Sequence, residues 1–301
     1  ECRMCGMRRE NDELVRQTAT PATTVEQLDL LKKRGVLAVG LLTGEYRRDT
    51  RHWAIGLARQ GLQAAIERDF RHILVNIGSL DAEELELLLE GVPRGEDGRV
   101  SPKVTMCTFQ ETYERGSYGK FMGENADNPR ADFERRLTNF DRAAAGGMRV
   151  VNPGVLLGLC TDVAYELVAL ALHVRHLQAL GLEVYLSVPR LRQATGAKNT
   201  RGVSDDDFVR LVAILSLGLP NAKIVITTRE PAEVQRRVLP MVTVLSAGSS
   251  AVAPYTETGA RFPLEASQFE VIDQRPIEQI LDEYRAEGFR FQNYDRPPLP
   301  A

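Results

Sequence analysis

The sequence has 301 residues, which is enough to bury a large core as one domain or two. Its net charge of −3 and pI near 6.0 exclude the strongly basic surface that nucleic-acid-binding domains carry. No apolar run approaches the roughly 20 residues of a membrane-spanning helix, so no membrane insertion is expected. The four cysteines are too few and too scattered for a disulfide framework, which favours a reducing, cytoplasmic compartment.

Apolar, β-branched runs alternate with amphipathic segments along the whole chain. Strands are predicted at 36–42, 72–77, 103–109, 148–152, 183–187, 223–228 and 242–246. Capping residues predict helix starts at Thr24, Asp81, Asp162 and Ser204, and Pro276 suits the first turn of a last helix. This alternation predicts a parallel sheet wrapped by helices, in which residues 1–288 form the folded unit and 289–301 an extended tail.

Two cysteines, Cys2 and Cys5, open the chain with the spacing C-x-x-C. By itself this pair fits half of a zinc site, a thiol redox pair or part of an iron–sulfur loop. No second C-x-x-C is present to complete a zinc site.

Short polar motifs follow several predicted strands, where the carboxyl ends of a parallel sheet place functional groups. They are Thr43-Gly44-Glu45, Gln110-Glu111-Thr112-Tyr113, Pro189-Arg190-Leu191-Arg192, Thr227-Thr228-Arg229-Glu230 and Leu245-Ser246-Ala247-Gly248. A glycine in such a turn lets a ligand approach the backbone, and a glutamate can accept a charge-assisted hydrogen bond from an ammonium group. An arginine at a strand end can bind a carboxylate with two parallel hydrogen bonds, or it can pair with a neighbouring acid.

Together with the cysteines, this ordered series resembles the radical S-adenosylmethionine (SAM) lyases of aromatic amino acids, from Cys2 to about Tyr284. The resemblance is greatest to the tryptophan lyase NosL and more distant to the tyrosine lyases ThiH and HydG. It implies a (β/α)8 barrel whose first strand and first cluster cysteine would precede Glu1. The cysteine loop of that superfamily reads C-x-x-x-C-x-x-C, and Cys2 and Cys5 match its second and third positions.

The same resemblance assigns roles to individual residues. Cys2 and Cys5 would bind a [4Fe–4S] cluster, and Arg229 and Ser246 would line the substrate site, with Arg229 anchoring the substrate carboxylate. Residues expected to bind SAM are Met4, Thr43, Gly44, Glu45, Glu111 and Arg190. The alternative for Arg229 is an ion pair with Glu230 at the rim of the barrel. An external one-electron reductant is also implied.

The implied function is fragmentation of L-tryptophan to 3-methyl-2-indolic acid for a thiopeptide antibiotic, and the small residues 247–253 favour the larger ring. One alternative is a tyrosine lyase of the ThiH type, which releases p-cresol and dehydroglycine. The HydG activity is not expected, because no cysteine follows Arg275 to hold a second cluster. Another alternative is a non-catalytic barrel whose C-x-x-C binds zinc or has no ligand.

Overall fold

A curved, wholly parallel sheet forms the centre of the computed structural model, which describes residues 1–16, 18–197, 202–248 and 267–292. Its seven strands pair in chain order, from β1 to β7. Their bounds are β1 Ala38–Leu42, β2 His72–Asn76, β3 Val104–Cys107, β4 Val150–Asn152, β5 Glu183–Ser187, β6 Lys223–Thr227 and β7 Val244–Ser246. Each strand lies within a predicted range, so the predicted parallel α/β fold is confirmed.

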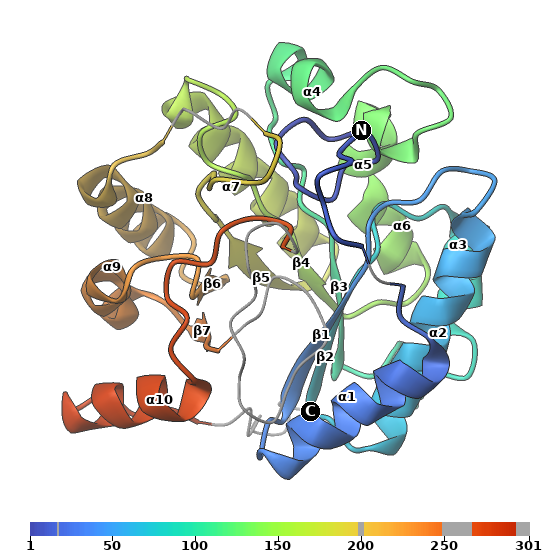
Figure 1. Cartoon of the computed structure of the whole chain (residues 1–301), viewed down its shortest axis with the longest axis horizontal. Coiled ribbons are helices and arrows are strands. Elements are labelled where there is room, and N and C mark those ends of the chain that lie inside the picture. Colours follow the sequence, from blue (N-terminus) through green and yellow to red (C-terminus); the bar gives the residue numbers. More distant parts are fainter. Residues whose placement is uncertain (17, 198–201, 249–266, 293–301) are drawn as a thin grey trace.

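Helices cover the outer face of the sheet (Figure 1). The described helices are α1 Pro21–Lys33, α2 Arg51–Glu67, α3 Ala82–Leu89, α4 Arg115–Met122, η1 Pro129–Ala131, α5 Phe133–Leu137, α6 Asn139–Ala145, α7 Val163–Ala179, α8 Asp205–Gly218, α9 Ala232–Val238, η2 Leu239–Met241 and α10 Ile277–Ala286. None of these helices is long and apolar enough to cross a membrane.

The predicted caps are confirmed except at the first helix. Asp81, Asp162 and Ser204 each accept a hydrogen bond from a backbone N–H in the first turn. The prediction at Thr24 is wrong, because α1 begins at Pro21 behind a capping box formed by Thr20 with Thr23. A proline at the first helical position needs no hydrogen bond for its nitrogen, which favours the earlier start.

The core lies between the sheet and the helices. Alternate strand residues such as Ile73, Val75 and Met106 are buried in this layer, while the intervening side chains face the inner surface of the sheet. Toward the amino ends of the strands this inner surface holds the rings of His72 and Tyr185, which are tilted by 43° with centroids 5.3 Å apart. The functional groups predicted above follow the carboxyl ends. The predicted tail falls mostly on residues 293–301, outside the described part.

Candidate functional site

The C-x-x-C segment forms a turn that lies against α4. The backbone N–H of Cys5 donates to the carbonyl of Cys2 at 3.0 Å, and that of Arg3 donates to Phe121 at 2.9 Å. Cys2 and Met4 are buried with Tyr118, Met122, Leu159 and Leu191. Cys5 is half-buried. Met4, one of the residues expected to bind SAM, packs in this apolar cluster, and its role in binding SAM stays a prediction.

The donor set of this turn fits part of an iron–sulfur site. Burial raises the pKa of the Cys2 thiol to about 11, although the Arg130 guanidinium opposes the shift. A metal binding at Cys2 would therefore have to displace a proton. Among the described residues, no group of three or more His, Cys, Asp or Glu side chains is placed to hold a metal. Cys2 and Cys5 can supply two of the three thiolates of a cluster loop, and the assignment stays a prediction.

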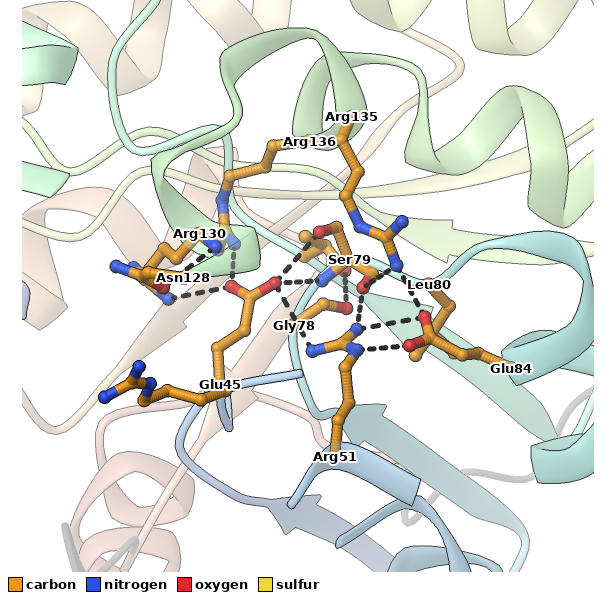
Figure 2. Close-up of polar contacts among 12 residues, drawn as sticks. Glu45, Arg51, Gly78, Ser79, Leu80, Glu84, Asn128, Arg130, Arg135 and Arg136 are labelled. Atoms are coloured by element: carbon orange, nitrogen blue, oxygen red, sulfur yellow. Dashed lines mark hydrogen bonds and ion pairs between the residues drawn. The ribbon is translucent and has the colours of Figure 1, made fainter. Parts of the chain in front are cut away.

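The Glu45 carboxylate is enclosed by cationic side chains (Figure 2). Its side chain is 1% exposed, and its Oε2 accepts from Arg136 Nη1 at 2.6 Å, with Arg130 Nη1 at 3.7 Å. The other oxygen, Oε1, accepts from the backbone N–H and the hydroxyl of Ser79, both at 2.9 Å, and lies 3.8 Å from Arg51. Both carboxylate oxygens therefore already have partners within the protein.

This arrangement accounts for the charge state of Glu45 and for a glycine beside it. Burial alone would raise the pKa of Glu45, but the guanidinium groups of Arg136, Arg130 and Arg51 outweigh burial and lower the pKa. Gly78 has φ of +92°, and a Cβ at this position would lie 2.4 Å from the Glu45 Cδ. No other residue type fits there. The expected contact between Glu45 and the SAM ammonium stays a prediction.

Glu111 follows β3 in a left-handed conformation, with φ of +70°. Its Oε1 pairs with Arg130 and lies 3.6 Å from Arg136 Nη2. Because Arg130 and Arg136 also contact Glu45, two arginines hold both carboxylates that the sequence assigns to SAM. A non-glycine residue at positive φ costs on the order of 1–3 kcal/mol, so its surroundings must hold this turn.

Glu166, in the first turn of α7, holds the loop that follows β3 in place. Its carboxylate is buried and accepts from the Thr112 hydroxyl at 2.6 Å, the Tyr113 N–H at 3.0 Å and the Glu114 N–H at 3.2 Å. A buried carboxylate with several donors is a strong anchor for a loop backbone. Glu166 therefore fixes the direction in which Glu111 leaves the sheet.

Arg190 is paired inside the protein. It is 2% exposed, and its Nε donates to Glu230 at 2.8 Å while its Nη1 donates to Asp205 at 2.7 Å. Glu230 also accepts from Arg192 at 2.7 Å. The acids around Arg190 thus satisfy its guanidinium, so the expected SAM contact would have to compete with them and stays a prediction.

Arg229, which follows β6, differs from Arg190 in its contacts. Glu230 pairs with Arg190 and Arg192 instead, and no ion pair of Arg229 occurs within the described residues. Its guanidinium donates one long hydrogen bond, 3.4 Å, to the Arg190 carbonyl, and it lies 3.5 Å from the centre of the Phe269 ring. Burial lowers the pKa of Arg229 to about 10, a shift that the negative charges of Glu111 and Glu230 oppose. The side chain stays charged at neutral pH and can accept a carboxylate partner.

Ser246 lies at the end of β7, in register with Thr227 of β6. It lines a cavity of about 110 Å³ between β1 and α10, together with Ala247 and Gly248. Gly248 has φ of +63°, and a Cβ there would lie 2.9 Å from the Ile277 Cβ. The turn and the packing of α10 therefore explain this small residue, and residues 249–253 of the same run lie outside the described part.

The remaining SAM residues, Thr43 and Gly44, follow β1. The Thr43 N–H donates to the Asn76 carbonyl at 3.0 Å, which continues the β1–β2 ladder. A Cβ on Gly44 would meet nothing within 4 Å, so no close contact within the described residues requires glycine here. Their role in binding SAM stays a prediction.

Four residues of this site were missed by sequence reasoning: Arg130, Arg136, Glu166 and Phe269. The two arginines lie in a polar stretch that resembles a solvated helix, and Glu166 looks like an ordinary helix-terminal acid. A weak signal existed in Asn128-Pro129-Arg130, a turn motif that orders the backbone beside the C-x-x-C segment. Phe269 follows a long segment without regular pattern, and nothing local marks it.

Comparison with known proteins gives matches over nearly the whole chain. The chain is 25% identical to the 2-iminoacetate synthase of Salmonella typhimurium over 296 residues, which is 96% of this chain and 72% of that protein. The Escherichia coli 2-iminoacetate synthase is 24% identical, with the same coverage. Residues 187–290, about a third of the chain, match the Biotin and Thiamin Synthesis associated domain.

Solved structures are also similar to this chain over nearly its whole length. The HydG maturase of the [FeFe]-hydrogenase is 28% identical with a TM-score of 0.77, and HydG from Carboxydothermus hydrogenoformans is 27% identical with a TM-score of 0.78. Both cover 96% of this chain, which spans 61% and 63% of their lengths. Methylornithine synthase, at 19% identity and a TM-score of 0.69, shares the fold.

These matches bear on the family resemblance. They support the likeness to the tyrosine lyases ThiH and HydG, while the greater likeness to the tryptophan lyase NosL stays a prediction. Radical SAM enzymes of the ThiH and HydG family use a [4Fe–4S] cluster and SAM. The chain thus has the parallel α/β fold of the radical SAM enzymes, and its similarity supports a place beside the tyrosine lyases of that superfamily.

Proposed function

We propose that this protein is a radical SAM lyase that cleaves a free aromatic amino acid, with L-tyrosine as its substrate. Support comes from the two 2-iminoacetate synthases, which match 96% of the chain. Their product name denotes the same compound as dehydroglycine, the fragment expected from a tyrosine lyase of the ThiH type.

Tryptophan is the second candidate, carried over from the motif resemblance. Its one structural argument was the run of small residues after Ser246. At Gly248 that argument fails, because the positive φ and the contact with Ile277 already require a glycine. The balance therefore favours tyrosine, and the carboxylate and amino groups, which both substrates share, would bind in the same way.

The observation that carries the proposal is the state of Arg229. Within the described residues it has no acidic partner, it is half-buried after a strand end, and it lies close enough to Glu111 for that negative charge to act on its pKa. A cation in such a place is costly unless a ligand supplies an anion. The carboxylate of an amino acid would remove that cost, and the guanidinium fork matches its geometry.

Other residues would divide the remaining work. Cys2 and Cys5 would hold the cluster. When bound, it would pass an electron from an external donor to SAM, which is the chemistry that yields a 5′-deoxyadenosyl radical. Glu111, fixed by Glu166 and two arginines, would orient SAM. The apolar cluster of Tyr118, Met122 and Leu159 keeps water from the Cys2 side of the site.

An anaerobic assay of the purified full-length protein tests the proposal. With SAM, a reductant and each amino acid in turn, mass spectrometry should find p-cresol and 5′-deoxyadenosine from L-tyrosine. An indole carboxylic acid from L-tryptophan, with tyrosine unchanged, would select the second candidate. A colourless protein with stoichiometric zinc, no absorbance near 400 nm and no product would instead support the non-catalytic alternative.

A further inference from the structure

A short segment, Ser267–Asp273, connects three parts of the site, and we call it the 267–273 strap. In Figure 1 it is part of the red trace that leads into α10. Three backbone hydrogen bonds hold it: Gly6 N–H to Gln268 O at 2.9 Å, Glu270 N–H to Gln193 O at 2.8 Å, and Asp273 N–H to Thr228 O at 3.0 Å. The strap is thus bonded to the C-x-x-C segment, to the loop after β5 and to the end of β6.

Both ends of the strap are held closely. At the first end, a Cβ on Gly6 would lie 2.8 Å from the Ser267 carbonyl and 3.0 Å from that of Gln268, so only glycine permits this approach. At the other end Asp273 is buried and accepts from Gln235 at 2.8 Å and from Arg275 at 2.6 Å. A segment anchored at both ends fixes the side chains between them.

Phe269 lies in the middle of the strap, with the centre of its ring 3.5 Å from the guanidinium carbon of Arg229, a separation short enough for the two groups to stack. Stacking uses the face of the guanidinium and leaves its N–H donors in the plane, directed outward. Of these donors, one makes the long bond to the Arg190 carbonyl. The ring therefore restricts the rotation of a long, flexible side chain without occupying the edge that a carboxylate needs.

We propose that Phe269, carried by the 267–273 strap, is a positioning residue that orients Arg229 to bind the carboxylate of an amino-acid substrate. This inference rests on the proposed function. It extends that function because it makes substrate binding depend on Phe269, which acts only through Arg229. The strap also bonds to Gly6, next to Cys5, so the arginine is positioned relative to the C-x-x-C segment and not only to its own strand.

The test compares Phe269→Leu and Phe269→Met, which lose the aromatic face, with Phe269→Tyr, which keeps it. Dissociation constants of the reconstituted holoenzyme with SAM are measured for L-tyrosine and L-tryptophan, and for tyramine and tryptamine, which lack the carboxylate. The first two variants should bind the amino acids ~3- to 30-fold more weakly, the range of a partly desolvated cation–π contact. Affinity for the amines and for SAM should not change, and Phe269→Tyr should match the wild type.

A loss of affinity that is restricted to the amino acids distinguishes a positioning role of Phe269 from general damage to the fold. Equal losses for amino acids and amines in the two ring-deleted variants would overturn the proposal, as would unchanged amino-acid affinity in both. In an Arg229→Gln background, Phe269→Leu should have no further effect, and an additive loss would also refute action through Arg229. A wild-type protein that binds neither amino acid would reject the proposed function itself, and the inference with it.

Discussion

Replacing Arg229 by glutamine tests the substrate anchor, and the structure predicts an unusual combination of effects. Loss of a charge-assisted contact to a carboxylate costs about 1.5–3 kcal/mol, or ~10- to 150-fold in affinity. The folded protein should lose little stability, because Arg229 has no ion pair within the described residues, and the burial that disfavours its charge offsets its contact with the Phe269 ring. Substrate affinity should therefore fall while the thermal midpoint changes little. Arg229→Lys keeps the charge but not the fork, so it should also bind weakly.

Arg190→Gln is the matched control, since both arginines follow neighbouring strands. Arg190 pairs with Glu230 and Asp205, and the Glu230 side chain is only 3% exposed. Removing one partner of a buried ion pair costs about 3–5 kcal/mol when the other charge is left unpaired. Arg192 still contacts Glu230, so the loss should lie below that range, but this variant should melt at a lower temperature than the wild type. Calorimetry for stability and anaerobic titration for substrate and SAM affinity measure both effects. If Arg229→Gln is destabilised like Arg190→Gln and keeps its substrate affinity, Arg229 is a structural residue and the reasoning fails.

Other predictions concern the scaffold of the site. Glu166→Gln places an amide donor against backbone N–H groups, so it should loosen the turn after β3 and weaken SAM binding in titrations, with cluster content kept. Burial lowers the pKa of His173 to about 4, so wild-type stability should decline as pH falls from 6.5 to 4, by about 3 kcal/mol at most, and His173→Asn should remove this dependence in denaturant melts. Gly78→Ala should destabilise the protein by more than about 2 kcal/mol through its clash with Glu45, whereas Gly288→Ala, with the same backbone φ but open space, should cost only the strain of positive φ.

The strands and most helix starts could be predicted because their causes are local. A run of β-branched residues such as Ile224, Val225 and Ile226 favours a strand wherever it packs, and Asp81 with Glu84 forms a capping box from four consecutive residues. The error at Thr24 is of the same local kind. Two capping signals lie within one turn of each other, and Pro21 decides between them.

The position of a motif after a strand could also be predicted, but the ion pairs that its charged side chains form could not. Arg190 and Arg229 look alike in the sequence, each a cation following a strand. Their difference has two causes. Helix α8 brings Asp205 to Arg190, and Glu230 pairs with Arg190 and not with Arg229. These are contacts between residues far apart in the chain, which no local pattern records.

Glu45 shows what this missing information means for experiments. The sequence presents Glu45 and Glu111 as two separate contacts for SAM, but both lie against Arg130 and Arg136. Removing either carboxylate leaves the buried Arg136 and the partly buried Arg130 with one acid between them, and the remaining acid should be drawn from its place. A loss of SAM binding in a Glu45 variant would therefore not identify Glu45 as a SAM ligand. Only a variant that keeps the arginines satisfied, or one that restores binding through a compensating change at Arg136, distinguishes contact from support.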